Sequence, residues 1–291
     1  MYPDKEQNTN HGPEVTKSDT SWQSIRKDIE ANITKMLADE RIARFYDDEE
    51  MKNEAREKLL KNEQYFVEHI LEALQQALNE KNKVILLFDV DDTIGKGFSK
   101  NYLLEDKLPQ EENKFITILR PSIEPLLKLI KQIDVNDRIE IGLCSNRGQE
   151  ALLQQLKDPE NLNPISKHIN QNRIYSSRDF LLKHYDVGEI DHAYFKLSNE
   201  LENDYDGNNI KKLFSNIISP QKIEQDEAGM VVHLANTGNS EKLVFYSDLK
   251  KQEENTGIVA VDDFVYPYYF DPNKGIYGVS LYQNGRFNLF L

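Results

Sequence analysis

The stretch that decides the fold is Val84–Thr93, which reads VILLFDVDDT. Its first five residues are apolar, a run too continuous for a half-exposed strand and too short for a typical helix. Such a run is typical of a buried strand in a parallel sheet. Three carboxylates, Asp89, Asp91 and Asp92, follow at its carboxyl end, where open α/β sheets place their ligand crevice. Because these carboxylates repel one another, we expect a bound cation or a proton among them.

Two more predicted strands also end in polar residues. The apolar stretch Arg138–Cys144 leads into Ser145, and the buried-type stretch Ile258–Val261 leads into Asp262 and Asp263. In a parallel sheet with right-handed crossovers, the carboxyl ends of the strands lie at one edge. We therefore expect these polar groups to converge with the first acid cluster.

In their order along the chain, these residues resemble the motifs of the haloacid dehalogenase (HAD) superfamily of phosphotransferases. Its first motif, an apolar strand followed by Asp-x-Asp-x-Thr, is matched by Asp89–Thr93. Its second motif, a strand ending in Ser or Thr, is matched by Ser145. The third motif is a lysine, for which Lys242 is the best candidate, and the fourth is the acid pair Asp262 and Asp263.

Two further points bear on this resemblance. Lys250 and Lys251 compete with Lys242 for the third motif, although both lie closer to the final acid pair. Arg120-Pro121 before a helix resembles a further feature of several phosphatases of the superfamily. Metal-dependent glycosyltransferases also carry an Asp-x-Asp motif, but they do not require a second acid pair at the end of another buried strand.

The resemblance implies hydrolysis of a phosphomonoester through an aspartyl-phosphate intermediate. Asp89 is then the nucleophile, and Asp91 protonates the leaving oxygen and later deprotonates the attacking water. Ser145 holds a phosphoryl oxygen, and Lys242 counters the charge of the phosphoryl group. The substrate-binding residues implied in this way are Ser145, Asn146, Arg147 and Lys242. Asp92 receives no catalytic role.

The resemblance also implies Mg²⁺ as the cofactor. A hard cation with oxygen ligands suits Asp89, the backbone carbonyl of Asp91 and Asp262, with Asp263 bound directly or through water. The six histidines show no HExxH pattern and no pair four residues apart, so zinc is not expected.

The substrate is less well defined by the sequence. The segment between Thr93 and Arg120 is too short for a large cap over the site, and an open site suits a phosphoprotein. The chain as a whole also resembles secreted bacterial effector phosphatases of this superfamily that act on phosphotyrosine. The alternatives are a phosphatase of small molecules, such as sugar phosphates or nucleotides, and a catalytically inactive HAD-like module that binds partners through its helices.

The expected fold is an α/β fold: a Rossmann-like parallel sheet with helices on both faces, an N-terminal helical addition and a mid-chain insertion. Residues 1–20 are polar and without periodicity, so we expect a disordered tail. Residues 21–82 carry apolar residues at helical spacing and form a helical region packed on the core. Residues 83–291 form the HAD-like catalytic core, with an insertion at about 160–230.

Smaller elements are predicted within this frame. The segment from Gly95 to Asn113 reads as a loop, and Phe115–Leu119 reads as a short strand. Helices are expected after Arg120-Pro121, after Gly148, over 180–184, over 210–218 and from 240 on, with strands over 172–176 and 230–234. The tail predicts a hairpin around Asn284-Gly285, a pair that suits a type I′ turn.

Composition excludes several classes of protein. The chain of 291 residues has a formal net charge of -14, so a general nucleic-acid binder is not expected. The single cysteine, Cys144, excludes an intramolecular disulfide. The N-terminus lacks a signal-peptide pattern, and no apolar run approaches the length of a membrane span. We expect a soluble, cytoplasmic protein or, from the narrower resemblance, an effector secreted into a host cytosol.

Overall fold

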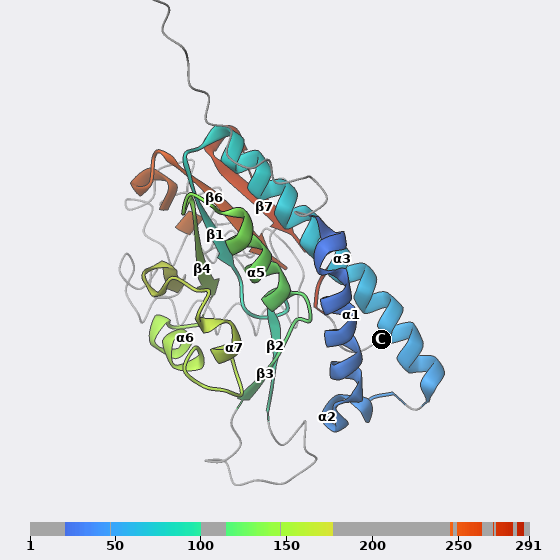
Figure 1. Ribbon diagram of the computed structural model, residues 1–291. Coiled ribbons are helices and arrows are strands. Elements are labelled where there is room, and N and C mark those ends of the chain that lie inside the picture. The colour runs from blue at the N-terminus through green and yellow to red at the C-terminus, as the bar shows by residue number, and fades with distance from the viewer. Residues whose placement is uncertain are drawn as a thin grey trace, which may run out of the picture.

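A parallel sheet of five strands forms the centre of the protein (Figure 1). The computed structural model describes residues 21–46, 48–99, 115–145, 147–176, 245–246, 249–263, 270, 272–281 and 284–287. The strand order is β5-β4-β1-β6-β7, and each neighbouring pair is parallel. The strands are β1 (Lys83–Phe88), β4 (Ile139–Ser145), β5 (Ile174–Ser176), β6 (Thr256–Asp262) and β7 (Ile276–Ser280).

The position of β1 within this sheet locates the binding crevice. β1 lies between β4, the next strand of the sheet along the chain, and β6, which follows β5. This is the arrangement of doubly wound α/β sheets, in which the strand order reverses beside the first strand. Ligands bind in such sheets outside the carboxyl ends of the strands at the reversal point. The carboxyl ends of β1 and β6 are therefore the expected location of a binding site.

Both faces of β1 are covered, as its continuous apolar sequence predicts. Val84, Leu86 and Phe88 belong to the larger core cluster, which includes the N-terminal helices. Ile85 and Leu87 point to the opposite face, into a smaller cluster with Phe245, Tyr246 and Leu249 of a helical segment. The alternation follows the period of two residues that a strand imposes on its side chains.

The N-terminal region is helical, as predicted. It consists of α1 (Trp22–Ala38), α2 (Glu40–Ala43) and α3 (Glu49–Glu80). α3 begins where the Asp48 carboxylate accepts a hydrogen bond from the Met51 amide at 2.8 Å, which satisfies one of the unpaired amides of the first turn. Apolar residues at helical spacing are buried along both long helices, among them Ile25, Ile29, Ile33, Phe66, Ile70 and Leu74.

The carboxyl-terminal end of α3 is fixed to the sheet by polar contacts. The Arg138 guanidinium, just before β4, donates to the carbonyls of Leu78 and Lys81 at 2.7 Å each. The Tyr277 hydroxyl of β7 donates to Glu80 at 2.7 Å. α3 therefore packs along the β6 and β7 side of the sheet, and α1 lies against α3 and α5 (Ile123–Ile133) (Figure 1).

One predicted loop is instead a strand. Gly95–Ser99 forms β2, which pairs antiparallel with β3 (Phe115–Leu119), so the expectation of a loop from Gly95 was wrong for these five residues. The two glycines, Gly95 and Gly97, weaken the strand signal of the sequence. Gly95 is required by close packing, because a Cβ there would lie 2.7 Å from the Thr117 Cγ2.

The predicted helices and strand after β3 are confirmed. The helix α5 follows Arg120-Pro121, α6 (Gln149–Gln155) follows Gly148, and β5 lies within the predicted strand over 172–176. α7 (Asn163–Ser166) and the 3-10 turn Gln171–Arg173 precede β5. The first part of the predicted insertion, up to Ser176, thus carries a strand of the central sheet; the remainder, residues 177–244, lies outside the described residues.

The type I′ turn predicted at Asn284-Gly285 is not formed, and most of the second strand of the predicted hairpin lies outside the described residues. β7 pairs parallel with β6, and a 3-10 turn, Pro272–Lys274, precedes it. Gly285 has a positive φ of 81°, but Asn284 does not, and a type I′ turn requires positive φ at both central residues. The amide of Phe287 donates to the carbonyl of Asp92 at 2.9 Å, so the chain after the turn runs against the loop that follows β1.

Several predictions concern residues outside the described part of the chain. These are the tail of residues 1–20, the elements over 180–184, 210–218 and 230–234, the start of the helix from 240 on, Asn146 and Lys242. Among the helices of the described residues, none combines the length and the apolar character that crossing a bilayer requires.

Candidate functional site

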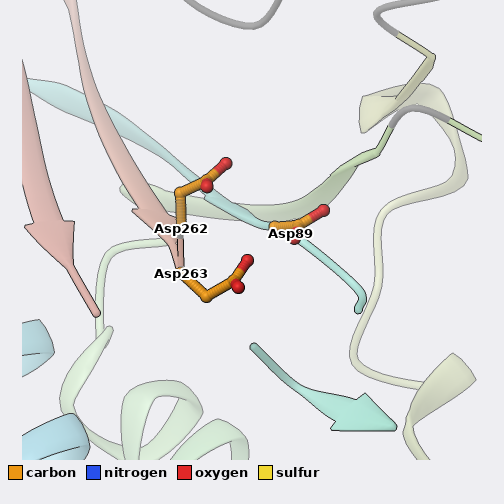
Figure 2. Close-up of side chains that lie close together, drawn as sticks. All are labelled: Asp89, Asp262 and Asp263. Atoms are coloured by element: carbon orange, nitrogen blue, oxygen red, sulfur yellow. The ribbon is translucent and has the colours of Figure 1, made fainter. Parts of the chain in front are cut away.

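Three buried carboxylates converge at the reversal point of the sheet. Asp89 follows β1, Asp262 ends β6, and Asp263 comes directly after it; Figure 2 shows the three side chains gathered at these two strand ends. One carboxylate oxygen of each residue lies within 4.8 Å of the others. Asp89 and Asp263 are 4% exposed and Asp262 is not exposed at all. The convergence expected from the strand pattern is therefore present for Asp89, Asp262 and Asp263.

The backbone holds the two strand ends together. The Asp89 amide donates to the carbonyl of Val261 at 2.9 Å, and the carbonyl of Asp262 accepts from the Leu281 amide at 2.8 Å. The parallel ladder between β1 and β6 continues to the last residues of β1. The acid cluster thus belongs to the rigid sheet, which favours a preorganised site.

The chemistry of this cluster favours a bound cation. Carboxylates removed from water lose favourable solvation, and like charges at this separation repel one another. A hard divalent cation compensates both costs, because Mg²⁺ and Ca²⁺ prefer oxygen ligands from carboxylates. The structure therefore contains a buried aspartate triad, Asp89, Asp262 and Asp263, that can hold a metal ion.

Asp91, the second acid of the Asp-x-Asp motif, lies apart from this triad. Its carboxylate forms an ion pair with Arg147, in which the Arg147 Nε lies 3.0 Å from Oδ2 and Nη2 contacts Oδ1. The Asp91 side chain is 52% exposed. The sequence placed its metal contact at the backbone carbonyl, and that contact stays a prediction. Arg147, a predicted substrate-binding residue, is thus paired with the second carboxylate of the Asp-x-Asp motif.

Ser145 lies at the same edge of the sheet as the triad. It is the last residue of β4, which is the neighbour of β1, and its side chain is buried. Its hydroxyl accepts a hydrogen bond from the Arg147 amide at 3.3 Å. The loop after β4 therefore fixes both Ser145 and Arg147 beside the end of β1.

The lysine of the third motif cannot be Lys250. Its ammonium donates to the carbonyls of Glu253 and Glu254, and these residues precede β6. Lys250 thus lies at the amino-terminal edge of the sheet, on the opposite side from the triad. Burial lowers the pKa of Lys250, and the nearby Lys81 lowers it further. Lys242 lies outside the described residues and stays the predicted lysine.

Asp92 contributes to the geometry of the loop after β1. Its backbone adopts a positive φ of 54°, which is uncommon for a residue with a side chain. Its carboxylate lies 2.9 Å from the Lys96 ammonium, and its carbonyl accepts from the Phe287 amide. Asp92 thus shapes the loop after β1.

Arg286 is a charged residue of the site that the sequence did not indicate. Its guanidinium donates twice to Oδ2 of Asp263, from Nη2 at 2.6 Å and from Nε at 3.1 Å. The Arg286 side chain is 39% exposed, whereas Asp263 is buried. No sequence signal marks this arginine, because its proximity to Asp263 depends on the path of the chain after β7.

A buried ion pair connects the segments that flank the site. Arg120 and Glu63 of α3 are fully buried, and the Arg120 Nε donates to Glu63 at 3.0 Å. The same guanidinium donates to the carbonyls of Thr93, at 3.0 Å, and Gly285. It also lies 3.8 Å from the centroid of the Phe66 ring. One side chain therefore joins the N-terminal helices, the loop after β1 and the turn before Arg286.

Burial lowers the pKa of the Arg120 guanidinium, and Glu63 opposes this effect. Glu63 is itself well supplied with donors: it accepts from the Ser122 amide at 3.2 Å and from the Ser122 hydroxyl. Buried charges persist in proteins when they are paired and hydrogen-bonded in this way.

Tyr246 lies close to Asp262 and Asp89. It is fully buried in the smaller core cluster, on the face of the sheet opposite to α3. Burial raises the pKa of the Tyr246 hydroxyl, and Cys144, Asp262 and Asp89 raise it further. The tyrosine therefore stays neutral beside the carboxylates.

No family model, curated protein or solved structure matches this chain. The function must therefore be inferred from the site itself.

Proposed function

We propose that this protein is a Mg²⁺-dependent phosphomonoesterase of the HAD type that works through an aspartyl-phosphate on Asp89. The observation that carries the proposal is the buried triad at the reversal point, with one oxygen of Asp89, Asp262 and Asp263 within 4.8 Å. The order of the motifs along the chain gives independent support, because a nucleophile strand, a serine strand and an acid-pair strand follow one another as in that superfamily.

The acids of the triad divide two tasks in this proposal, metal binding and nucleophilic attack. Asp262 and Asp263 would hold the cation together with one oxygen of Asp89, and the other oxygen of Asp89 attacks phosphorus. When bound, Mg²⁺ would offset part of the negative charge of the acid cluster and of the phosphoryl group. Tyr246, close to Asp262 and Asp89, adds no charge to the site, since its raised pKa keeps the hydroxyl protonated.

Asp91 transfers the proton in this mechanism. The leaving oxygen takes a proton from Asp91, and the water that later attacks the aspartyl-phosphate returns a proton to it. Both carboxylate oxygens of Asp91 contact Arg147 in the substrate-free protein. The carboxylate can therefore face a leaving group only after Arg147 turns away, and a phosphoryl group is an anion that can draw Arg147 toward itself.

Ser145 holds a phosphoryl oxygen, and Lys242 and Asn146 complete the phosphoryl site from the predicted motifs. Phosphoryl transfer depends mostly on positioning and on charge stabilisation. The buried hydroxyl of Ser145 and the cation of Lys242 supply these two contributions.

The experiment that tests the proposal is hydrolysis of an aryl phosphate with and without Mg²⁺. The wild-type protein should hydrolyse the ester only with the metal, and Asp89→Asn should abolish turnover. Asp28→Asn on α1, an exposed aspartate remote from the site, is the matched control and should keep full activity. An Asp89→Asn variant with an unchanged rate contradicts the mechanism.

The narrower proposal is that the substrate is a phosphoprotein, in particular phosphotyrosine. It is supported by the half-exposed Asp91 side chain, which lies at the surface, where a bulky leaving group can reach it once Arg147 turns away. Comparing phosphotyrosine peptides, phosphoserine peptides and sugar phosphates at equal concentrations tests it. Preference for a sugar phosphate or a nucleotide identifies a small-molecule phosphatase. Failure to turn over any ester, with the fold intact, favours an inactive module that binds partners.

A further inference from the structure

The described side chains at the site carry a net negative charge. Among the described residues, the carboxylates of Asp89, Asp91, Asp262 and Asp263 are accompanied by the guanidinium groups of two arginines. The arginines compensate only half of the negative charge. The remainder equals the charge of one divalent cation.

Arg286 has the placement of a functional residue. Both of its neighbours are anchored: the carbonyl of Gly285 accepts from Arg120, and the amide of Phe287 donates to the carbonyl of Asp92. The Phe287 ring is buried, and Gly285 has a positive φ of 81° that favours glycine. A fixed backbone on each side aims the Arg286 side chain at the acid triad.

The contact between Arg286 and Asp263 places a positive charge on a carboxylate of the metal triad. Both donors of Arg286 use Oδ2 of Asp263, a residue of the metal triad. A cation bound by Asp263 lowers the attraction of this carboxylate for the guanidinium and also repels it. The Arg286 side chain is 39% exposed, so its guanidinium is not locked in the protein interior.

We propose that Arg286 is a phosphate-binding residue that is held by Asp263 until the metal binds and is then transferred to an oxygen of the substrate phosphoryl group. The proposal rests on the proposed function and adds a residue to its substrate site. Arginine suits this role because its guanidinium binds carboxylate and phosphate with the same fork of donors. Arg147 changes partner in the same way: it leaves Asp91 for the phosphoryl group. Substrate binding thereby also releases Asp91, the proton donor.

The test uses Arg286→Gln and Arg286→Lys in the full chain. Arg26→Gln is the matched control, because Arg26 is a partly exposed arginine paired with Glu30 at 2.7 Å on α1. Two affinities are measured by calorimetry: that of Mg²⁺ for the protein alone, and that of inorganic phosphate for the protein saturated with Mg²⁺. Thermal unfolding checks that each variant is folded.

Arg286→Gln should bind Mg²⁺ more tightly, by a factor of about three or more, because a competing cation is removed. It should bind phosphate at least about tenfold more weakly, as expected for the loss of a charge-assisted hydrogen bond. Arg286→Lys should lie between the wild type and Arg286→Gln in phosphate affinity, and Arg26→Gln should match the wild type in both measurements.

Weaker or unchanged Mg²⁺ binding in Arg286→Gln, or unchanged phosphate binding, overturns the proposal, because a purely structural arginine has no opposite effects on the two ligands. If Arg286→Gln does not fold, Arg286→Lys decides by the same two affinities. A wild-type protein that binds both ligands but hydrolyses no ester refutes the proposed function alone. A wild-type protein that turns over esters as fast as Arg286→Gln, with equal affinities, refutes the role of Arg286 alone.

Discussion

Replacing Glu63 by alanine should destabilise the protein strongly, although Glu63 lies outside the acid triad. The change leaves the Arg120 guanidinium fully buried without its carboxylate, and two donors of Ser122 lose their acceptor. Removing one partner of a buried ion pair costs about 3–5 kcal/mol. The carbonyls of Thr93 and Gly285 still accept from Arg120, which limits the loss, so we expect about 3–4 kcal/mol.

The assay is equilibrium unfolding in urea, with Glu57→Ala as the control. Glu57 lies on the same helix, α3, but is exposed, so its removal should change the free energy of unfolding by less than about 0.5 kcal/mol. The double variant Glu63→Leu with Arg120→Met should recover a large part of the loss, because an apolar pair replaces the uncompensated charge.

A loss below about 1 kcal/mol in Glu63→Ala would refute the reasoning, since it would mean that Arg120 is compensated by water or by another acid. A double variant as unstable as Glu63→Ala would also contradict it. In that case the packing of the side chains, rather than the buried charge, would dominate the loss.

Three further predictions follow from other parts of the structure. Mg²⁺ added to chelator-treated protein should raise the thermal unfolding midpoint, and Asp262→Asn should remove most of this rise; equal rises in both proteins would argue against the triad as the metal site. Gly142→Ala should cost more than about 2 kcal/mol in urea unfolding, because the added Cβ would lie 2.1 Å from the Arg173 carbonyl oxygen. Burial, together with Lys131 and Lys167, lowers the pKa of His168, so the unfolded chain binds more protons and stability should fall as the pH drops below about 6.5. His168→Gln should flatten this pH dependence, and an unchanged slope would contradict the assignment.

The sequence was sufficient for the features that depend on local patterns and on one general rule of sheets. The apolar run before Asp89 indicated a buried parallel strand, and the acid pair at Asp262 marked the end of another. Because parallel strands share one carboxyl edge, their convergence followed without knowledge of the loops. The buried triad was predictable for this reason. The N-terminal helices were predictable from their apolar residues at helical spacing.

The contacts between distant segments could not be predicted. Arg286 looks like an ordinary surface arginine in the sequence, and nothing local indicates that it reaches Asp263. Arg120-Pro121 resembles a feature of several phosphatases, but nothing local indicates that Arg120 is buried against Glu63. Both contacts depend on how the N-terminal helix α3 and the chain after β7 meet the loop that follows β1.

Local signals also misled in two places. The glycines of β2 weaken the strand signal in the sequence. The segment is nevertheless a strand, because its backbone pairs with the facing strand β3. The Asn284-Gly285 pair suits a type I′ turn, but only Gly285 has a positive φ, and the Phe287 amide donates to the carbonyl of Asp92 in the loop after β1. Tertiary pairing overrides the local preference in both cases.

The most direct test of the central claim is to trap phosphate on Asp89. The Asp91→Asn variant, which lacks the group that activates the attacking water, is mixed with an aryl phosphate and Mg²⁺, quenched in acid and mapped by peptide mass spectrometry. We predict a base-labile phosphoryl group on Asp89 that is absent without Mg²⁺ and absent when Asp89 is also replaced by asparagine. Ester hydrolysis by the wild-type protein with no label in the variant, or a label on another residue, would contradict the account.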